Sequence, residues 1–278
     1  MSKLSEDDKE VEDLEIALLL EGVYRRYGYD FRDYSLAHLR RRLRHRRESS
    51  SLPDMGTMLH RVLSDRGFFE LLLRDLSISV TEMFRDPGVY RRVREEVVPR
   101  LMTWPFVKIW HAGCATGEEV YSMAILLDEA GLLHKSLLYA TDLNPTAIEA
   151  VRSGIFPLRH MKQYSENYIL SGGKKEFSSY YTALYDRVKF DTRLTARMTL
   201  ATHNLVSDRS FNEFQMIFCR NVLIYFDKNL QDKVLQLFDE SLEKLGFLVL
   251  GSKENIRFHT LAPKYVQLDK EKIWRKMM

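Results

Sequence analysis

The stretch HAGCATGEEVYSMA, residues 111–124, decides how the rest of this chain is interpreted. Gly113 and Gly117 lie between an apolar run and a helical pattern, which predicts a glycine turn between a strand and a helix. Turns of this kind bind phosphates, because free N–H groups and the helix dipole favour negative charge at a helix N-terminus. Glu118 and Glu119 stand at the start of the expected helix, where two carboxylates would repel a pyrophosphate. We therefore expect a nucleotide-like ligand that carries no phosphate.

The next strand-like run, residues 137–141, is followed by an acidic residue, Asp142. An acid at this position of an α/β sheet typically binds ribose hydroxyls, and its separation from Gly117 is close to the usual ~20 residues. A positively charged adenosine ligand satisfies the glycines, the ribose acid and the acidic helix start, and S-adenosylmethionine (SAM) fits with its sulfonium and ammonium groups. A nicotinamide cofactor is the alternative, although its pyrophosphate would meet the two glutamates. The GxxxG spacing alone is also compatible with a tight turn that binds no ligand.

The pattern after residue 106 is that of an α/β fold. Short apolar runs alternate with helical stretches, which predicts a parallel, doubly wound sheet. The expected strands are residues 107–110, 137–141, 198–203, 214–219 and 247–252, and the expected helices are residues 118–130, 145–153 and 228–245. Residues 154–197 interrupt the alternation with aromatic, strand-like segments, and we interpret them as a small inserted β-subdomain. The final run, YVQLDKEKIWRKM, predicts an antiparallel hairpin that closes the sheet.

The first part of the chain follows a different pattern. Apolar residues recur at helical spacing through residues 9–76, and no strand-like alternation occurs before residue 106. We therefore predict an all-helical N-terminal domain over residues 1–78, a linker over residues 79–105, and the α/β domain over residues 106–278.

The linker contains one expected helix. Asp86 and Pro87 give it a clear start, because Asp is a favoured N-cap residue and Pro is favoured at the first helical position. We expect the helix to run to about residue 98, where Pro99 disturbs it.

Composition and charge exclude several classes of protein. The chain of 278 residues is 45% hydrophobic and 29% charged with a net charge of +3, values that are ordinary for a globular protein. The acidic start MSKLSEDDKE argues against a signal peptide, and no apolar run approaches the roughly 20 residues that span a bilayer. Cys114 and Cys219 fit a reducing compartment, and the scattered histidines do not indicate a metal site. We expect a cytoplasmic protein that holds no metal.

The stretch LRRRLRHRR, residues 39–47, places six arginines on one expected helix. An apolar stripe at helical spacing predicts its buried face: Leu36, Leu39 and Leu43. The arginines that this arrangement leaves facing outward are Arg40, Arg41, Arg44 and Arg47. A solvated face is the plain interpretation, but like charges this close repel one another. A basic patch of this kind suits nucleic acid or an acidic protein surface.

Six short motifs follow one another along the chain: SVTEMFR (79–85), HAGCATGEEVYS (111–122), ATDLN (140–144), HNL (203–205), IFCRNVLIYFD (217–227) and LGSKEN (250–255). Together they resemble the chemotaxis receptor methyltransferases, the CheR family, over about residues 10–278. The resemblance implies an all-helical N-terminal domain, a linker, and a Rossmann-like SAM-dependent methyltransferase sheet that carries a small β-subdomain.

The resemblance also implies which residues bind the cofactor. Glu119 would hold the ammonium end of the methionine, and Asp142 would hold the ribose. The other cofactor residues come from the linker, the glycine turn and the later strand ends: Ser79, Thr81, Arg85, Gly113, Asn204, Leu205, Arg220 and Asn221. Ser79, Met83 and Val120 depart from the residues that are common in the family, and GSKE stands where GHSE is usual. We expect these departures to affect affinity for the cofactor more than activity.

By the same resemblance, the chain is expected to transfer methyl groups from SAM to glutamate side chains in the cytoplasmic domain of chemoreceptors. S-adenosylhomocysteine would be the second product. A glutamate carboxylate is already ionised at neutral pH, so the reaction needs no general base. Arg85 and Tyr225 would orient this carboxylate, and the arginine-rich helix would dock the glutamate-rich receptor.

Other interpretations remain open at this stage. An RNA or DNA methyltransferase would use the arginines on phosphates, but the [DN]PP[YFW] stretch typical of amino-methylating enzymes is replaced here by CRNVLIYF. The acceptor could instead be another acidic protein, or the chain a noncatalytic module that binds SAM or a receptor. Structural roles are the alternative for three residues: a core position for Tyr225, a surface ion pair for Arg220, and a capping role for Asp142.

Overall fold

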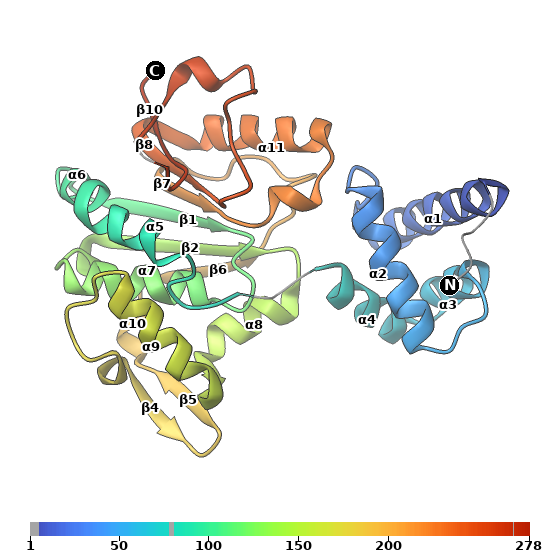
Figure 1. Cartoon of the computed structure of the whole chain (residues 1–278), viewed down its shortest axis with the longest axis horizontal. Helices are drawn as coiled ribbons and strands as arrows, with labels where there is room; N and C mark the ends of the chain where they lie inside the picture. Colours follow the sequence, from blue (N-terminus) through green and yellow to red (C-terminus); the bar gives the residue numbers. More distant parts are fainter. Residues whose placement is uncertain (1–5, 78–80, 269) are drawn as a thin grey trace. The chain divides into compact units, whose positions relative to one another are not determined.

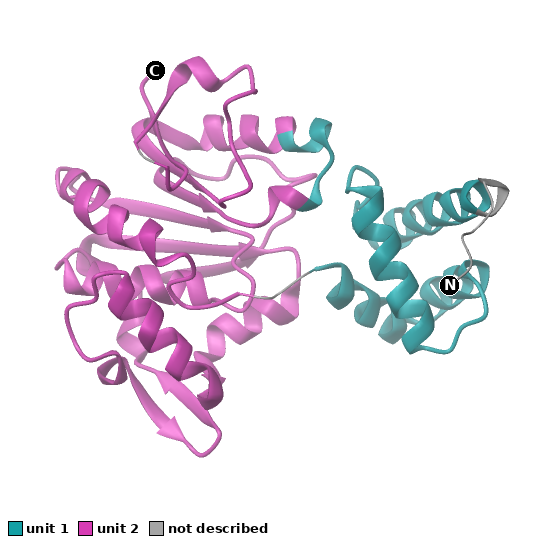
Figure 2. Cartoon of the chain, viewed as in Figure 1, with its two compact units in different colours: residues 1–78, 225–231 teal, residues 79–224, 232–278 magenta. Residues whose placement is uncertain are grey.

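The computed structural model describes residues 6–77, 81–268 and 270–278. By its contacts the chain divides into two compact units, which Figure 2 shows in different colours. The first, the helical unit, comprises residues 1–78 and 225–231. The second, the sheet unit, comprises residues 79–224 and 232–278. The chain therefore contributes to the helical unit twice.

The helical unit is built from helices, as the apolar spacing predicts. They are α1 (Glu6–Tyr27), α2 (Leu36–Ser49), α3 (Met55–Ser64) and α4 (Arg66–Leu76) (Figure 1). Acidic N-caps fix two helix starts: Asp54 accepts a hydrogen bond from the N–H of Thr57 at the start of α3, and Asp65 caps α4 in the same way. Fully buried side chains from all four helices form the core, among them Ile16, Leu43, Met58 and Leu72. No helix in the described ranges is both long and apolar enough to cross a membrane.

The prediction for the buried face of α2 is wrong at one position. Leu39 and Leu43 are buried, but Leu36 is 42% exposed. Leu36 is the first residue of α2, and it lines a hollow of about 560 Å³ in the helical unit together with Leu14 and Leu18 of α1. The apolar spacing along α2 therefore serves a core face and also a surface groove.

Residues 225–231 complete the helical unit from a distant part of the chain. The N–H of Ser35 donates a hydrogen bond of 2.9 Å to the carbonyl of Tyr225. The next pair, Tyr34 and Phe226, forms an isolated antiparallel β-bridge, and their rings meet edge to face with centroids 4.9 Å apart. Sequence analysis did not predict this pairing, because neither segment carries a local signal of its partner.

The linking helix extends further than predicted. It consists of α5 (Pro87–Arg92), a π-helical turn (Val93–Val97) and α6 (Val98–Leu101), so Pro99 lies inside the helix. In the π-helical turn the N–H of Val98 donates to the carbonyl of Val93, five residues earlier. This wider turn relieves the steric conflict between a proline ring and the carbonyl four residues before it, and the helix continues past Pro99.

The sheet unit contains a seven-stranded sheet with the order β6-β2-β1-β7-β8-β10-β9. Its strands are β1 (Val107–Ala112), β2 (Ser136–Asp142), β6 (Met198–Thr202), β7 (Phe214–Cys219), β8 (Leu242–Leu250), β9 (Tyr265–Gln267) and β10 (Ile273–Lys276). Neighbouring strands from β6 to β8 are parallel, whereas β9 and β10 form an antiparallel hairpin at the edge. This confirms the predicted Rossmann-like α/β sheet and its closing hairpin. The strand order reverses between β1 and β7, where ligands of such sheets bind.

Helices cover both faces of this sheet. Adjacent residues of a strand point to opposite faces. On β1, the ring of Trp110 packs edge to face on Phe238 of α11, whereas the next residue, His111, is hydrogen-bonded to Glu119 of α7. α7 and α11 therefore lie on opposite faces. The main helices that cover the sheet are α7 (Glu118–Glu129), α8 (Pro145–Ser153) and α11 (Lys228–Ser241), whose first turn, residues 228–231, belongs to the helical unit.

The insertion predicted within residues 154–197 contains a small three-stranded sheet with the order β3-β5-β4. Its elements are β3 (Ile155–Pro157), α9 (Met161–Leu170), β4 (Tyr181–Leu184), β5 (Arg187–Phe190) and α10 (Thr192–Thr195). Glu129 at the end of α7 accepts hydrogen bonds from the hydroxyls of Tyr168 and Tyr180 of the insertion. The same carboxylate pairs with Arg94 of the linking helix at 2.5 Å. Glu129 thus joins three parts of the sheet unit.

The boundary between α11 and β8 differs from the predicted helix over residues 228–245. The helix ends at Ser241, and Leu242 already pairs with β7. The strand register then shifts at a bulge, in which Leu245 has a left-handed φ of 68°. Apolar residues keep a helical spacing through this bulge, which is why the pattern alone extends the helix too far.

Candidate functional site

The glycine turn connects the carboxyl end of β1 to α7, beside the point where the strand order reverses. Gly113 has a φ of 78° and Gly117 a φ of 100°, both in the left-handed region that favours glycine. A Cβ on Gly113 would lie 2.6 Å from Cγ2 of Val222, and a Cβ on Gly117 would overlap Val151. The N–H of Gly113 donates to the carbonyl of Thr141 at 2.9 Å, which ties the turn to the end of β2.

The two glutamates that open α7 have different partners. Glu118 is buried and accepts hydrogen bonds from the hydroxyls of Thr116 (2.6 Å) and of Tyr164 in α9 (3.2 Å). Burial raises the pKa of Glu118, and these hydrogen bonds do not offset it. Glu119 alone contacts residues at the ends of β1 and β7. Glu118 is thus held by the glycine turn and by α9.

Glu119 is the acidic centre of the site. Its Oε1 lies 3.0 Å from Nδ1 of His111 on β1, and its Oε2 lies 3.3 Å from Nη1 of Arg220, which follows β7. Burial raises the pKa of Glu119, but the hydrogen bond from His111 and the charge of Arg220 outweigh burial and leave this pKa below its ordinary value. The carboxylate is thus ionised at neutral pH, as the binding of an ammonium group requires.

Arg220 is buried, so its interpretation as part of a surface ion pair is wrong. Its side chain is 2% exposed, and besides Glu119 it pairs with the carboxylate of Asp86 at 2.5 Å. It also donates to the backbone carbonyl of Arg85 at 3.0 Å. Asp86 is the N-cap residue of α5 and Pro87 is its first residue, as predicted, but Asp86 has a left-handed φ of 56° and its side chain makes no capping hydrogen bond. The carboxylate pairs with Arg220 instead. Arg220 therefore joins the linker to the start of α7.

Asp142 ends β2 next to the glycine turn. One of its carboxylate oxygens accepts the N–H of Ala115 and the other accepts the N–H of Asn144, each at 2.9 Å. Burial raises the pKa of Asp142 more than these hydrogen bonds lower it. The residue that caps α8 is Asn144, whose side chain accepts the N–H of Thr146. Each oxygen of Asp142 keeps a further lone pair, so the carboxylate can still accept ribose hydroxyls.

Asn204 and Leu205 follow β6 at the same edge of the sheet. The preceding residue, His203, donates its N–H to the carbonyl of Asp142 at 3.1 Å, which brings this segment beside the ribose acid. The side-chain oxygen of Asn204 accepts the N–H of Val206 at 3.0 Å and shapes a turn. Both Asn204 and Leu205 are half-buried.

The linker carries three of the predicted site residues. Ser79 lies outside the described residues, whereas Thr81 and Arg85 belong to the sheet unit and are half-buried. The N–H of Phe84 donates to the hydroxyl of Ser122 in α7 at 2.8 Å. This hydrogen bond anchors the segment that carries Arg85 to the helix that carries Glu119.

Sequence analysis missed three residues that shape the site. His111 orients Glu119, Asp86 pairs with Arg220, and Glu254 after β8 accepts the N–H of Asn221 at 3.0 Å. Glu254 had a signal in the sequence, the acid in the LGSKEN motif, but His111 and Asp86 had none that separates them from other polar residues.

Tyr225 belongs to the helical unit, not to the sheet unit that holds the other predicted catalytic residue, Arg85. Its ring packs against His38 of α2, with centroids 4.5 Å apart. Burial lowers the pKa of His38 to about 4, with a smaller contribution from the charges of Arg42 and Arg41. His38 is therefore neutral at physiological pH, and Tyr225 packs against an uncharged ring.

The arginines of α2 divide into two sets. Arg40 and Arg44 are not free, contrary to expectation: Arg40 pairs with a carboxylate of α1, and Arg44 makes two hydrogen bonds of 2.6 Å to Glu12. Among the described residues, no carboxylate pairs with Arg41 or Arg42. Arg46 pairs with Asp75, and Arg47 lies 3.9 Å from Glu48. The positive charge that α2 offers to a partner is therefore carried mainly by Arg41 and Arg42.

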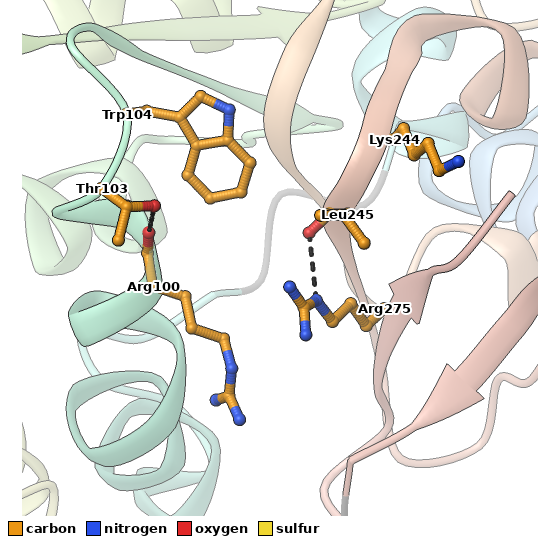
Figure 3. A pocket seen from close by; sticks show the side chains of 6 residues that line it. All are labelled: Arg100, Thr103, Trp104, Lys244, Leu245 and Arg275. Atoms are coloured by element: carbon orange, nitrogen blue, oxygen red, sulfur yellow. Dashed lines mark hydrogen bonds between the residues drawn. The ribbon is translucent and has the colours of Figure 1, made fainter.

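A second hollow, of about 330 Å³, lies on the sheet unit away from the predicted residues. Figure 3 shows its lining: Arg100, Thr103, Trp104, Lys244, Leu245 and Arg275. Nε of Arg275 donates to the carbonyl of Leu245 at 3.4 Å, and Lys244 points away from Trp104. None of the predicted site residues lines this hollow.

The residues at these strand ends fit a cationic adenosine ligand. Glu119 is ionised, Asp142 retains acceptor capacity, and the glycines of the turn add no side chain to the site. In the described part of the chain, no three His, Cys, Asp or Glu side chains are grouped to hold a metal ion.

Comparison with known proteins gives matches over both parts of the chain. The family described as "CheR methyltransferase, SAM binding domain" matches residues 79–271, and "CheR methyltransferase, all-alpha domain" matches residues 14–77. The chain is similar to the Cher3 protein of Pseudomonas putida, with 49% identity over 265 residues that cover 95% of this chain and 97% of the relative. It is also similar to the chemotaxis protein methyltransferases of Listeria monocytogenes (27% identity, 84% of this chain and 87% of the relative) and Escherichia coli (28%, 84% and 81%).

Proposed function

Because this chain belongs to the CheR methyltransferase family, we propose that it transfers methyl groups from SAM to glutamate side chains of chemoreceptors. The products are glutamate methyl esters and S-adenosylhomocysteine. The observation that carries the proposal is the grouping of Glu119, Asp142 and Arg220 at the strand ends, inside the segment that matches the SAM-binding domain. The names of the chemotaxis relatives supply the class of substrate.

The cofactor would be held by residues on both sides of the glycine turn. Glu119 takes the ammonium group of the methionine, and Asp142 takes the ribose hydroxyls. Gly113 allows the turn to pack closely against Val222, because a Cβ there would lie 2.6 Å from Cγ2 of that residue. When bound, SAM supplies an electrophilic methyl group on its sulfonium. The remaining residues frame the adenine or close the site: Ser79, Thr81, Arg85, Asn204, Leu205, Arg220 and Asn221.

The chemistry requires little from the protein beyond alignment. The acceptor glutamate is ionised at neutral pH, so no residue has to remove a proton. Attack of an anion on a sulfonium cancels both charges, and a dry, well-aligned site supplies most of the acceleration. Arg85 orients the acceptor by its charge, and Tyr225 orients it through its hydroxyl.

The substrate would dock on the outward charge of α2. Methylation regions of chemoreceptors are glutamate-rich helices, and the guanidinium groups of Arg41 and Arg42, which no carboxylate of the described residues pairs with, suit such a surface. The signalling domains of these receptors are cytoplasmic, so we place the enzyme in the cytoplasm. An acidic protein is favoured over nucleic acid, because the family carries chemotaxis names.

Transfer of labelled methyl from SAM to membranes that contain the organism's chemoreceptors tests the proposal. We expect label that mild alkali releases as methanol, since a methyl ester is hydrolysed where an N-methyl group is not. The label should be lost in Asp142→Asn, which removes the acid proposed for the ribose. Alkali-stable label, or label on RNA, would contradict glutamate as the acceptor. Binding of SAM without any transfer to receptors would instead indicate a noncatalytic module.

A further inference from the structure

Glu254 is a buried carboxylate, 4% exposed, whose hydrogen bonds all come from the backbone of one corner of the sheet unit. Its Oε1 accepts the N–H groups of Val222 (2.9 Å) and Ile224 (3.3 Å). Its Oε2 accepts those of Asn221 (3.0 Å) and Gly251 (2.6 Å). Four donors therefore converge on a single acceptor group.

The backbone on both sides is adapted to this arrangement. Asn221 adopts a left-handed φ of 61°, which turns its N–H and those that follow toward the carboxylate. Gly251 has no space for a side chain, because a Cβ would lie 2.7 Å from Oε2 of Glu254 and 2.9 Å from the nitrogen of Asn221. The loop after β7 is thus held by a side chain of the loop after β8.

The loop that Glu254 binds, residues 220–224, borders the candidate site. Val222 lies directly against the glycine turn, because its Cγ2 is 2.6 Å from the position of a Cβ on Gly113. Arg220, at the start of the same loop, pairs with Glu119 and Asp86. A displacement of the loop would therefore move Val222 off the glycine turn and Arg220 off its two carboxylates.

We propose that Glu254 is a positioning residue for the cofactor, which fixes residues 220–224 so that Arg220 and Asn221 meet SAM in one conformation. The inference rests on the proposed function, since it assumes that this site binds SAM. Glu254 acts through the loop and makes no contact with the cofactor itself. An ionised carboxylate only accepts hydrogen bonds, so a glutamine is a poor replacement: its NH₂ group would face backbone donors.

The test compares Glu254→Gln with the wild type by calorimetric SAM binding and by thermal unfolding. Glu129→Gln is the matched control, because Glu129 is also a buried carboxylate of the sheet unit, yet its partners Arg94, Tyr168 and Tyr180 are not candidate cofactor residues. We expect Glu254→Gln to weaken SAM binding by about tenfold or more, which is ~1.4 kcal/mol. Glu129→Gln should lower the Tm and leave the Kd for SAM within about twofold.

Glu254→Asp keeps the carboxylate on a side chain that is one methylene shorter. This variant also tests the inference if Glu254→Gln does not fold. Its SAM affinity should lie between those of the wild type and Glu254→Gln. In receptor methylation, both variants should raise the KM for SAM more than they lower kcat at saturating SAM. Unchanged affinity in the Glu254 variants, or an equal loss in Glu129→Gln, would overturn the inference and leave the proposed function intact. A wild-type protein that binds no SAM would overturn both.

Discussion

Glu118 and Glu119 are neighbours in the sequence, yet their surroundings shift their pKa values in opposite directions. One step along a helix turns a side chain by about 100°, so Glu118 meets Tyr164 while Glu119 meets His111 and Arg220. The sequence predicts an acidic helix start, but it does not tell which glutamate serves the site. That assignment depends on partners from distant segments.

Replacement of Glu118 by glutamine should remove a loss of folding stability that the wild type has at neutral pH. A carboxyl group with a raised pKa in the folded state contributes stability below its unfolded pKa of 4.5, and this contribution is lost as the pH rises through the folded pKa. The free energy of unfolding of Glu118→Gln, relative to the wild type, should therefore increase from pH 4.5 to pH 7. Denaturant titrations across this range would measure it, and a difference that does not vary with pH would contradict the assignment.

Gly113→Ala should impair both stability and SAM binding. The new side chain meets a φ of 78° and Cγ2 of Val222 at 2.6 Å, so we expect a loss of about 1–3 kcal/mol in stability. Val222→Ala removes the clashing methyl group but not the backbone strain, so the double variant should regain part of the SAM affinity. A double-mutant cycle that gives no interaction energy would show that the loop and the turn are independent.

The six arginines of α2 look alike in the sequence, but the neighbouring helix distinguishes them. Arg44 is bound by Glu12 of α1, and Arg40 is paired with the same helix, so these two contribute to the packing of the helical unit. Arg41 and Arg42 have no carboxylate partner among the described residues. Helical spacing predicts which side chains share a face, but it does not predict which charges on that face are already neutralised.

Two variants of α2 should therefore behave differently. Arg41→Ala combined with Arg42→Ala should raise the KM for the receptor and leave the Tm and SAM affinity unchanged. Arg44→Ala should lower the Tm, because Glu12 is 9% exposed and would lose both of its hydrogen bonds. Methylation kinetics at low and high salt would test the docking role, since screening should reduce the effect of the double variant. Equal KM values in the double variant and the wild type would contradict it.

The order and type of the elements in the sheet unit were predictable, because apolar periodicity is a local property of the chain. Their ends were not. The linking helix passes Pro99 through a π-helical turn, and α11 stops at Ser241 because Leu242 pairs with β7. In both places the outcome depends on a geometry that a local pattern of residue types does not encode. Leu36 is a further example. Its helical spacing predicts a buried side chain, but at the start of α2 this side chain is exposed.

The division of the chain into two compact units is harder to predict from the sequence than its helices and strands are. The motif IFCRNVLIYFD reads as one continuous stretch, but its last residues pack with the helices of the N-terminal part. Candidate cofactor residues up to Asn221 belong to the sheet unit, whereas Tyr225 belongs to the helical unit. The motif places Asn221 and Tyr225 four residues apart, but contacts such as that between Tyr34 and Phe226 assign the two residues to different units.

A fragment of residues 1–78 should show that the N-terminal helices depend on residues 225–231. In the whole chain the N–H of Ser35 is bound by the carbonyl of Tyr225, so it should exchange slowly with solvent deuterium. In the fragment the same amide should exchange faster, and a peptide of residues 222–233 added in trans should restore part of its protection. Site-resolved hydrogen exchange would measure this. Equal protection of Ser35 in the fragment and in the whole chain would contradict the pairing.

The return of residues 225–231 to the helices also determines how this protein can be recombined with its relatives. A chimaera joined at residue 78 would take Tyr34 and Ser35 from one parent and Tyr225 and Phe226 from the other, so its β-bridge would combine unmatched halves. A breakpoint that respects the contacts has to carry residues 225–231 along with the N-terminal helices. The exchangeable helical module is therefore discontinuous in the gene, and it cannot be transplanted as one uninterrupted segment.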